Sequence, residues 1–434
     1  MSGFPAHIQT LLSALRFQDA GREAVRTLTG QEWVDLFTRW DVQQLLIPLR
    51  RDCSGGADLP EWVRSRIDRN LIANAERLAR IQAAYSHFSR ALGETGAGHL
   101  VIKGFTLWPG FVDHPRYRLQ SDIDIYCPPD SILRARDTLR ELGYQPSNGW
   151  VSPWADHLPV MAPKSTWRWR GDYFDPEMPA QFELHFRLWN ERALRIRPIG
   201  LEQFWERRVE RSLDGARFPG LNAADNFGYA ALNLARNLVL DQASPHQIYE
   251  LARFLHLQRE DRALWKEWRE THSGSLRRIE AASCRMAVRH FDCRVPDEVR
   301  DEMERLPKAT KTWFDLCAEP SNLWPERPHK DWFWLHFSLL DSPGDRISIL
   351  RTRLFPTRLS PICPTDLQGM DDGSPARPSP GRRLGRYVRN FASRLHYYFG
   401  LLPATLWRGA RLWLAAHGRT ASPRRPFPRP FSST

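Results

Sequence analysis

Two aspartates, Asp122 and Asp124, stand two residues apart inside an apolar, β-branched run. In a β-strand, side chains at positions i and i+2 point to the same face, so both carboxylates would face one way while Ile123 and Ile125 face the core. Two neighbouring like charges repel, and they usually need a cation between them or a shifted pKa. Mg²⁺ prefers carboxylate oxygens together with substrate phosphates. The pair therefore indicates a phosphate-handling metal site; on spacing alone, the alternative is a pair of solvated loop carboxylates.

The segments around this pair would supply the elements that position it. Residues 99–104 have the pattern of a short buried strand that ends in a glycine turn, and residues 131–142 that of an amphipathic helix. Residues 181–188 alternate between apolar and polar side chains, which places Glu183 and His185 on one face of a further strand. For His185, a structural hydrogen-bonding role and a role in the site both remain open.

Together these segments resemble the nucleotidyltransferase superfamily, whose pattern is a glycine turn, an acidic pair on one strand and a third acidic residue on a later strand. Within it, the chain is most similar to the bacterial family described as uncharacterised nucleotidyltransferase, over roughly residues 30 to 355. The matching pieces are Ile102-Lys103-Gly104, Arg118 to Asp124, Leu139 to Tyr144 and Glu183-Leu184-His185. One departure is the turn itself: the wider superfamily has Gly-Ser, this chain has Gly104-Phe105, and Thr106 lies close by.

The resemblance implies a metal-dependent enzyme that moves a nucleoside monophosphate from a nucleoside triphosphate to an unidentified hydroxyl acceptor, with Mg²⁺ or Mn²⁺ as cofactor. The residues that it implies for catalysis and metal binding are Asp122, Asp124 and Glu183, with His185 as an accessory residue. Those that it implies for nucleotide binding are Lys103, Gly104, Arg118 and Ser121. If Glu183 faced the other side of the sheet, Asp172 or Asp175 would replace it as the third acid.

Two other classes of function remain open. A transferase fold without catalysis would serve as a binding or scaffold protein, for example near envelope-polysaccharide assembly at the membrane. A phosphohydrolase that uses carboxylates and metal would cleave nucleotides with water and need no acceptor. The sequence contains no phosphate-binding loop of the G-x-x-x-x-G-K-[ST] type, no G-x-S-x-G and no H-E-x-x-H.

The positive charge of the chain is confined to its C-terminal end. Among 434 residues, 62 Lys and Arg face 50 Asp and Glu, which gives a formal net charge of +12. From Gly373 onward there are twelve arginines, no lysine and no acid, so the remainder is formally neutral. No specific nucleic-acid partner is therefore expected for the body. The six cysteines are scattered without a C-x-x-C pair, which argues against a zinc site or disulfide framework and fits the cytoplasm.

The pattern as a whole predicts an α+β protein with a small mixed-sheet core between helical regions. The expected divisions are an N-terminal helical region (1–96), a nucleotidyltransferase-like α/β core (97–220), a C-terminal helical region (221–360) and a Pro/Arg-rich linker with a basic tail (361–434). Helices are expected over residues 31–50, 59–92, 222–239, 245–257, 265–289 and 298–306. Residues 147–180, rich in Trp and Pro, are expected to form either a hairpin with an acceptor-binding role or a structural insertion.

The tail combines arginines with aromatic and aliphatic residues. Residues 371–380 have the composition of a disordered linker, and residues 384–414 predict helices broken at Pro403. Basic and apolar faces together suit an anionic membrane surface, which would make the protein membrane-peripheral. The alternatives are a tail helix that docks on the body and plain disorder.

Overall fold

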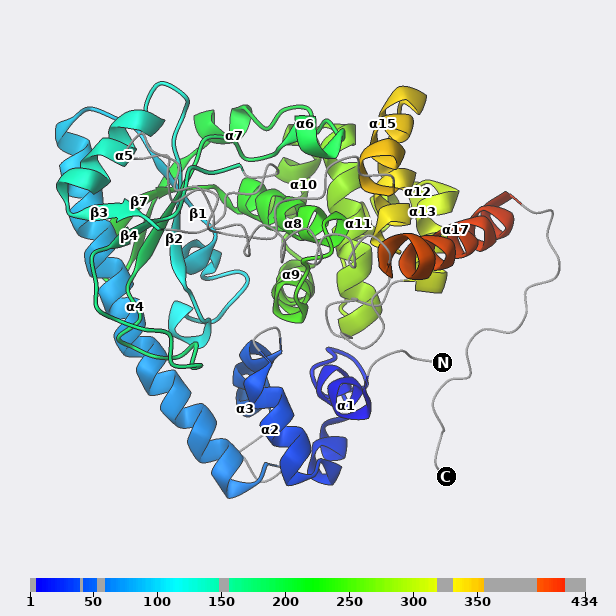
Figure 1. Ribbon diagram of the computed structural model, residues 1–434, viewed down its shortest axis with the longest axis horizontal. Helices are drawn as coiled ribbons and strands as arrows, with labels where there is room; N and C mark the ends of the chain where they lie inside the picture. Colours follow the sequence, from blue (N-terminus) through cyan, green and yellow to red (C-terminus); the bar gives the residue numbers. More distant parts are fainter. Residues whose placement is uncertain are drawn as a thin grey trace, which may run out of the picture.

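The computed structural model describes residues 5–39, 42–52, 59–147, 156–317, 331–354 and 396–417. In these residues a seven-stranded mixed sheet stands between N-terminal and C-terminal helices (Figure 1). The α+β class predicted from the sequence is confirmed. The linker predicted at 371–380 and the tail outside 396–417 lie outside the described residues, as do Trp150 and Trp154 of the 147–180 segment.

The sheet has the spatial order β3-β4-β5-β2-β1-β7-β6. Its centre is formed by β2, which pairs in parallel with β5 and antiparallel with β1. The strands are β1 (Leu100–Ile102), β2 (Asp122–Tyr126), β3 (Tyr144–Pro146), β4 (Met161–Pro163), β5 (Gln181–His185), β6 (Val209–Leu213) and β7 (Ala216–Gly220). The β6–β7 hairpin was not predicted, although its Asp214-Gly215 turn is a hairpin signal that the sequence carries.

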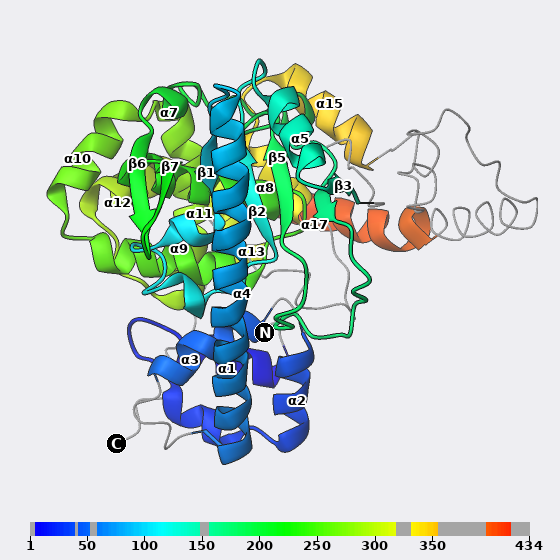
Figure 2. The ribbon, with the colours of Figure 1, turned by 90° about the vertical axis from the view of Figure 1, so that its left-hand side faces the viewer.

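One face of the sheet is covered by the long helix α4 (Glu61–Glu94), which crosses in front of it in Figure 2, and by α5 (Ile132–Glu141). Tyr85, Phe88 and Leu92 of α4 pack in one buried cluster with Ile123 and Ile125 of β2. The lower part of α4 packs with the N-terminal helices (Figure 1). These are α1 (Ala6–Ala14), α2 (Gly30–Thr38) and α3 (Leu46–Asp52).

The other side of the sheet faces the C-terminal helices, of which α8 (Ala223–Val239) and α9 (Pro245–Gln258) lie nearest the carboxylates. Asn222 precedes α8 and caps it, because its side chain accepts a hydrogen bond from the Asp225 backbone N–H. The helices that follow β5 in the sequence, up to residue 354, are α6 (Glu191–Leu194), α7 (Gln203–Glu206), α8 (Ala223–Val239), α9 (Pro245–Gln258), α10 (Arg262–Thr271), α11 (Gly274–Phe291), α12 (Asp297–Arg305), α13 (Lys308–Cys317), α14 (Trp332–Leu339) and α15 (Pro343–Leu354).

Two predicted helices are each divided in the structure. In place of one helix over residues 31–50, the structure has two, α2 and α3. Pro48 lies in the first turn of α3, where the missing N–H of proline costs no hydrogen bond. The helix predicted over residues 265–289 is α10 and α11, which separate at His272. Ser273 caps α11 by accepting from the Leu276 backbone N–H, and Gly274 follows it.

A buried network of charges joins α8 to α11 around His272. The imidazole Nδ1 lies 2.8 Å from Glu280 Oε1 and Nε2 lies 3.1 Å from Asp225 Oδ1. Arg207 donates two hydrogen bonds to Asp225, and Trp268 Nε1 donates to Glu280. Burial opposes protonation, but the two carboxylates outweigh it and raise the pKa of His272 to about 9. The protonated imidazole therefore ties together two helices of the body.

The C-terminal helix α17 (Leu402–His417) docks on the body, after a π-helical turn at His396–Leu401. The turn passes directly into α17 between Leu401 and Leu402, and Pro403 lies in the first turn of α17, so the break predicted at Pro403 is not observed. Trp334 Nε1 donates to the Thr405 carbonyl, and Arg408 forms an ion pair with Asp331 at 2.7 Å. The docking alternative is therefore confirmed for these residues. No helix among the described residues has both the length and the apolar character needed to cross a membrane.

Candidate active site

The two acidic strands lie side by side in parallel register. Asp124 of β2 is paired with Glu183 of β5, and Asp122 with Gln181. Ile123 and Ile125 are fully buried against the helices of the other face, so the carboxylates point away from those helices, towards α8 and α9. The strand position predicted for Glu183 is confirmed. Its catalytic role stays a prediction.

The fallback candidates Asp172 and Asp175 serve a different purpose. Asp172 accepts a hydrogen bond from the Phe174 backbone N–H. Asp175 accepts from Trp167 Nε1 and from the Glu177 backbone N–H. Both carboxylates thus stabilise the turn that precedes β5.

Lys103 brings its ammonium group directly to the acidic pair. Its Nζ lies 2.6 Å from Asp124 Oδ1, in a side chain that follows the end of β1. The backbone of Lys103 has φ 56° and ψ −156°, a region that residues with a Cβ rarely adopt. Gly104 follows at φ +50°, and a Cβ there would lie 2.3 Å from Gln120 Nε2. The Lys-Gly turn is therefore a strained segment that holds a cation at Asp124.

His185 is fully buried behind the carboxylates. Its Nε2 lies 2.9 Å from Asp124 Oδ1 and 3.6 Å from Glu183 Oε2, and its Nδ1 lies 3.5 Å from Asp156 Oδ1. Burial and Lys103 disfavour the charged form, but hydrogen bonding to the acids prevails and raises the pKa of His185 to about 10. The imidazole is therefore a charged partner that holds the acids together. Asp156, which also pairs with Arg236 at 2.6 Å, was not predicted.

The two aspartates of the pair differ in electrostatic environment. Burial raises the pKa of Asp122 to about 7, and the negative charges of Asp124 and Glu183 add to this effect. For Asp124, burial acts in the same direction but is outweighed by Lys103 and His185, which lower its pKa. Among the described residues, no cation forms a direct ion pair with Asp122. Asp122 is therefore the carboxylate that lacks a positive partner.

A polar cavity of about 960 Å³, including its open mouth, lies over the acidic pair. Five of the residues predicted from the sequence line it: Lys103, Gly104, Arg118, Asp122 and Asp124. Its other polar walls are side chains of α8 and α9 that were not predicted: Tyr229, Asn233, Arg236, Asn237, Gln247 and Glu250. The four from α8 are spaced as one helical face, and this polar stripe was the available signal.

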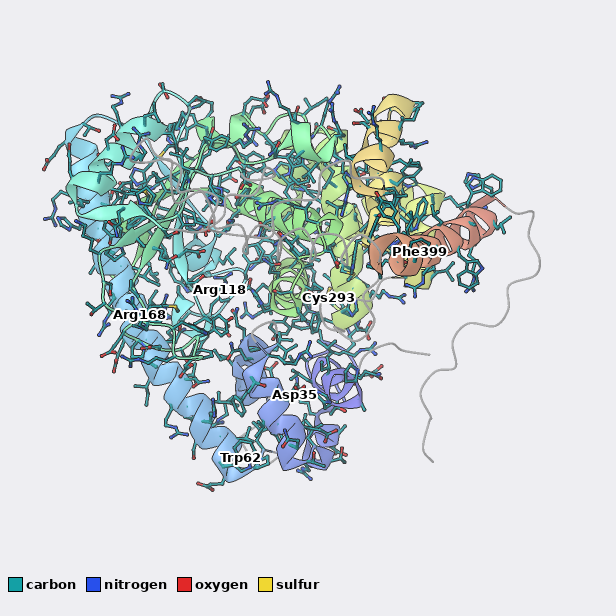
Figure 3. The ribbon with its side chains drawn as sticks, viewed as in Figure 1. Asp35, Trp62, Arg118, Arg168, Cys293 and Phe399 are labelled. Carbon is teal, nitrogen blue, oxygen red and sulfur yellow. The ribbon has the colours of Figure 1, made fainter. Side chains whose placement is uncertain are left out.

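Other predicted residues take up different positions. Arg118, which lies between the sheet and α9 in Figure 3, donates from Nε to Glu250 Oε1 at 2.7 Å. Ser121 is exposed and does not line the cavity, so its role in nucleotide binding stays a prediction. The Thr106 hydroxyl donates to the Lys103 carbonyl at 2.7 Å, and so stabilises the turn rather than facing the cavity.

The start of β2 is held by a buried arginine of α4 that was not predicted. Arg77 Nε donates to the Gln120 carbonyl at 2.7 Å, and Nη2 donates to the Ser121 carbonyl at 3.1 Å. Nη1 donates to the Met178 carbonyl at 3.0 Å. Burial lowers the pKa of Arg77 to about 10, so the group remains charged at neutral pH. Arg77 fixes the backbone just before the acidic pair and just before β5.

The donor atoms at this site suit a divalent cation. Carboxylate oxygens of Asp124 and Glu183 lie within 4.8 Å of each other, and Asp122 adds a carboxylate on the same strand face; His185 Nε2 belongs to the same group of atoms, but in its protonated form it has no lone pair for a metal. Carboxylate oxygens are the ligands that Mg²⁺ and Mn²⁺ prefer. The Lys103 ammonium is the group that a bound cation would replace at Asp124 Oδ1. The uncompensated charge of Asp122 supports the same fit.

The family model described as uncharacterised nucleotidyltransferase matches residues 30–292. This range contains the Lys-Gly turn, both acidic strands and the polar stripe of α8. The searches of curated proteins and of solved structures found no match.

Proposed function

The chain belongs to the uncharacterised nucleotidyltransferase family, and we propose that it transfers a nucleoside monophosphate from a nucleoside triphosphate to a hydroxyl acceptor. The family match supports nucleotidyl transfer in general. The observation that carries the specific proposal is the register of β2 and β5, which sets Asp124 opposite Glu183 beside a polar cavity that also contains Lys103. The proposed catalytic and metal-binding residues are Asp122, Asp124 and Glu183.

The chemistry proposed for this site is an in-line displacement. The acceptor hydroxyl loses its proton to water, its oxygen forms a bond to the α-phosphorus, and the α–β phosphoanhydride bond breaks to release pyrophosphate. A divalent cation, Mg²⁺ or Mn²⁺, would supply neutralisation of phosphate charge and a lowered pKa of the acceptor hydroxyl. Asp122 and Asp124 would hold the cation from β2, and Glu183 would hold it from β5.

The residues around the carboxylates have separate tasks in this proposal. Lys103, once released from Asp124, neutralises phosphate oxygens, since its flexible stem can follow the negative charge into the cavity. Gly104 lets the backbone approach the phosphates closely. His185 stays protonated and orients Asp124 and Glu183 without touching the nucleotide. The amide groups of Asn233 and Asn237 offer hydrogen bonds to the sugar or base.

The two alternative functions differ from this proposal in what they require. A scaffold protein needs no acidic triad, and the retention of Asp122, Asp124 and Glu183 on one face of the sheet favours catalysis over it. A phosphohydrolase would release the nucleoside monophosphate into water without an acceptor. Incubation with an α-³²P-labelled nucleoside triphosphate, with and without Mg²⁺, tests all three. Transfer of label to an acceptor supports the proposal, release of free monophosphate supports hydrolysis, and absence of Mg²⁺-dependent nucleotide binding contradicts both enzymes.

For the tail, we propose contact with an anionic membrane surface through the outer face of α17, on a cytoplasmic protein. Large apolar side chains remain exposed on α17, namely Leu406, Trp407, Trp413 and Leu414, and Phe399 is exposed on the turn before it. Arg411 stacks on Trp407 with its guanidinium 4.9 Å from the ring centroid. Exposed aromatic groups beside arginines are typical of helices that lie in the interface of an anionic bilayer. The docked inner face leaves this outer face available.

A further inference from the structure

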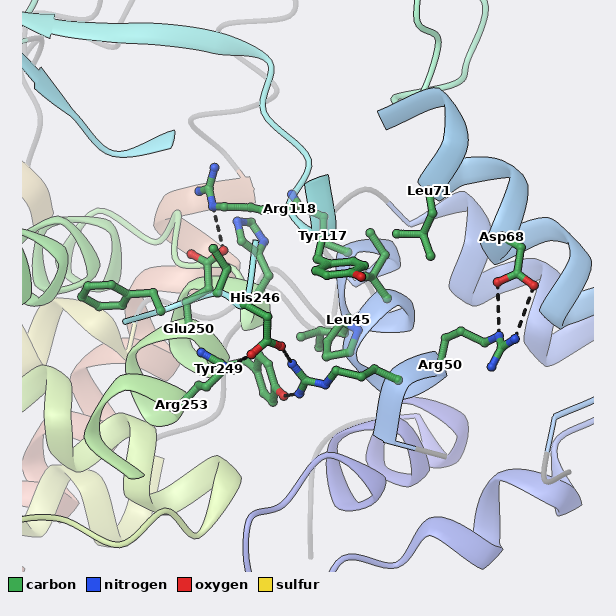
Figure 4. Close-up of a pocket in the computed structure, with 17 residues that line it drawn as sticks. Leu45, Arg50, Asp68, Leu71, Tyr117, Arg118, His246, Tyr249, Glu250 and Arg253 are labelled. Atoms are coloured by element: carbon green, nitrogen blue, oxygen red, sulfur yellow. Dashed lines mark hydrogen bonds and ion pairs between the residues drawn. The ribbon is translucent and has the colours of Figure 1, made fainter. Parts of the chain in front are cut away.

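A second cavity lies between the N-terminal helices and α9 (Figure 4). It contains about 900 Å³ of empty space, including its open mouth. Much of its wall is apolar, with contributions from Leu45, Ile47, Leu71, Phe111 and Val112. The wall comes from four regions of the chain that meet only in the folded protein: residues 44–51, residues 68–71 of α4, the segment before β2, and α9.

The arginines of this cavity are all engaged in ion pairs, although its lining has four arginines and three carboxylates; Arg51 also pairs with Asp52, outside the lining. Each of its four arginines has an acidic partner, as the dashed lines in Figure 4 show. The pairs are Arg50 with Asp68, Arg118 with Glu250, and Arg51 and Arg253 with Asp113. Burial, helped by Arg118, lowers the pKa of His246 to about 3, so this imidazole is neutral. A charged ligand would have to break an existing ion pair, whereas an uncharged apolar ligand would not.

The second cavity adjoins the polar cavity of the candidate active site. Phe111, Arg118 and Glu250 line both, so the Arg118–Glu250 ion pair stands where the two meet. One side of this boundary carries the acidic pair and Lys103, and the other carries apolar side chains. The two cavities thus offer adjoining places for two substrates of different chemistry.

We propose that the second cavity binds the acceptor, and that the acceptor has an uncharged, apolar body with its hydroxyl directed past Arg118 and Glu250 to the acidic pair. This inference rests on the proposed nucleotidyl transfer and specifies the substrate class of that same site. It excludes nucleic acids and sugar phosphates as acceptors, because the described cavity has no unpaired arginine to receive a phosphate.

The nucleotide itself fits the polar cavity better than the apolar one. The polar cavity holds Asn233, Asn237 and Gln247, whose amides can meet the hydrogen-bonding groups of a base and a ribose. The apolar cavity has one amide side chain, Gln44, among its described lining residues. A base placed there would leave most of its polar edge without partners.

The test uses the full chain and N-phenyl-1-naphthylamine, an uncharged aromatic probe that fluoresces when it enters an apolar site. Leu71→Trp should fill the cavity and weaken binding of this probe at least tenfold. Ile72→Trp is the matched control. Ile72 is the residue next to Leu71 on α4, but its side chain is 64 % exposed and does not line the cavity. Val112→Phe is a second filling variant, in case Leu71→Trp does not fold. Both filling variants should bind α,β-methylene-ATP with Mg²⁺ as the wild type does.

Competition then decides the chemistry of the ligand. The apolar alcohol 2-naphthaleneethanol should displace the probe, whereas glycerol 3-phosphate should not, and the probe and the ATP analogue should bind together. Probe binding that survives both filling variants would overturn the proposal, as would displacement by glycerol 3-phosphate. Competition between the probe and the ATP analogue would assign the cavity to the nucleotide instead. A wild type that binds the probe but no Mg²⁺-dependent nucleotide would refute the transferase function, and the acceptor role with it.

Discussion

Asparagine substitutions at Asp122 and Asp124, made one at a time, should change the stability of the metal-free protein in opposite directions. Both variants should lose Mg²⁺-dependent nucleotide binding, since each removes a proposed metal ligand. Their surroundings differ, however. Asp124 Oδ1 contacts Lys103 and His185, whereas Asp122 has no described cation in direct contact.

The expected gain for Asp122→Asn follows from its pKa, which burial and the neighbouring carboxylates raise from 3.8 to about 7. A raised carboxyl pKa means that the folded protein holds this proton more tightly than the unfolded chain. The destabilisation caused by Asp122 therefore grows as the pH rises from 3.8 and is complete above about 7. The difference between these two pKa values corresponds to a destabilisation of at most about 4 kcal/mol, and the partial solvent exposure of Asp122 lowers this figure. We expect the variant to be more stable by about 1–3 kcal/mol at pH 8 and by less at pH 5.

The expected loss for Asp124→Asn has a different origin. The substitution leaves Lys103 and His185 buried without the carboxylate that they share. Removing one partner of a buried ion pair typically costs about 3–5 kcal/mol. The loss should be present across the neutral pH range, because both cations are charged there.

Urea denaturation followed by tryptophan fluorescence, in EDTA between pH 5 and pH 8, measures both effects. Asp137→Asn, at a carboxylate exposed on α5, controls for the loss of one negative charge and should change stability by less than about 0.5 kcal/mol. A loss of stability in Asp122→Asn as large as that in Asp124→Asn would refute the unequal roles. A gain in Asp122→Asn that does not depend on pH would refute its electrostatic origin.

Three further predictions concern other parts of the molecule. His272→Gln should be less stable than the wild type by about 3 kcal/mol at pH 6, and the gap measured by urea denaturation should close as the pH rises through about 9, because a raised histidine pKa stabilises the fold only below that value. Gly104→Ala should weaken Mg²⁺-dependent nucleotide binding more than tenfold in titration calorimetry, whereas Gly143→Ala, with the same left-handed strain (φ +85°) but open space around its Cβ, should not. The double variant Trp407→Ser and Trp413→Ser should keep the thermal midpoint of the wild type but lose most sedimentation with anionic vesicles, since both side chains are 61 % exposed; unchanged sedimentation would contradict the membrane proposal.

The acidic strands were predictable because their signal is local. The period of two in residues 122–126 and 181–185 assigns each carboxylate to a face of its strand without any knowledge of the neighbours. Which strand pairs with which is not local. The resemblance to the nucleotidyltransferases supplied that part, and the observed register of Asp124 with Glu183 agrees with it.

The remaining parts of the site could not be predicted by the same reasoning. Asp156 acts through His185 and Arg236, which are 29 and 80 residues away in the sequence, and no short pattern encodes such a contact. The composition of the tail also predicts only part of its structure. The sequence predicts an amphipathic basic helix, but the inner face of α17 docks because Gly409 allows close contact with Trp334, which the local pattern does not reveal.

Lys103 shows why type and spacing alone leave a site incompletely defined. In the sequence it is a lysine at the end of a strand, where exposure of the ammonium group to water is the ordinary outcome. In the structure a strained backbone turns it inward to Asp124, and strain of this kind costs about 1–3 kcal/mol and persists only where surrounding contacts enforce it. The Thr106 hydroxyl on the Lys103 carbonyl and the packing of Gly104 against Gln120 are such contacts. A turn that served only to connect two strands would have no reason to retain this strain, so the inward position of Lys103 is itself an argument that the acidic pair needs an exchangeable cation.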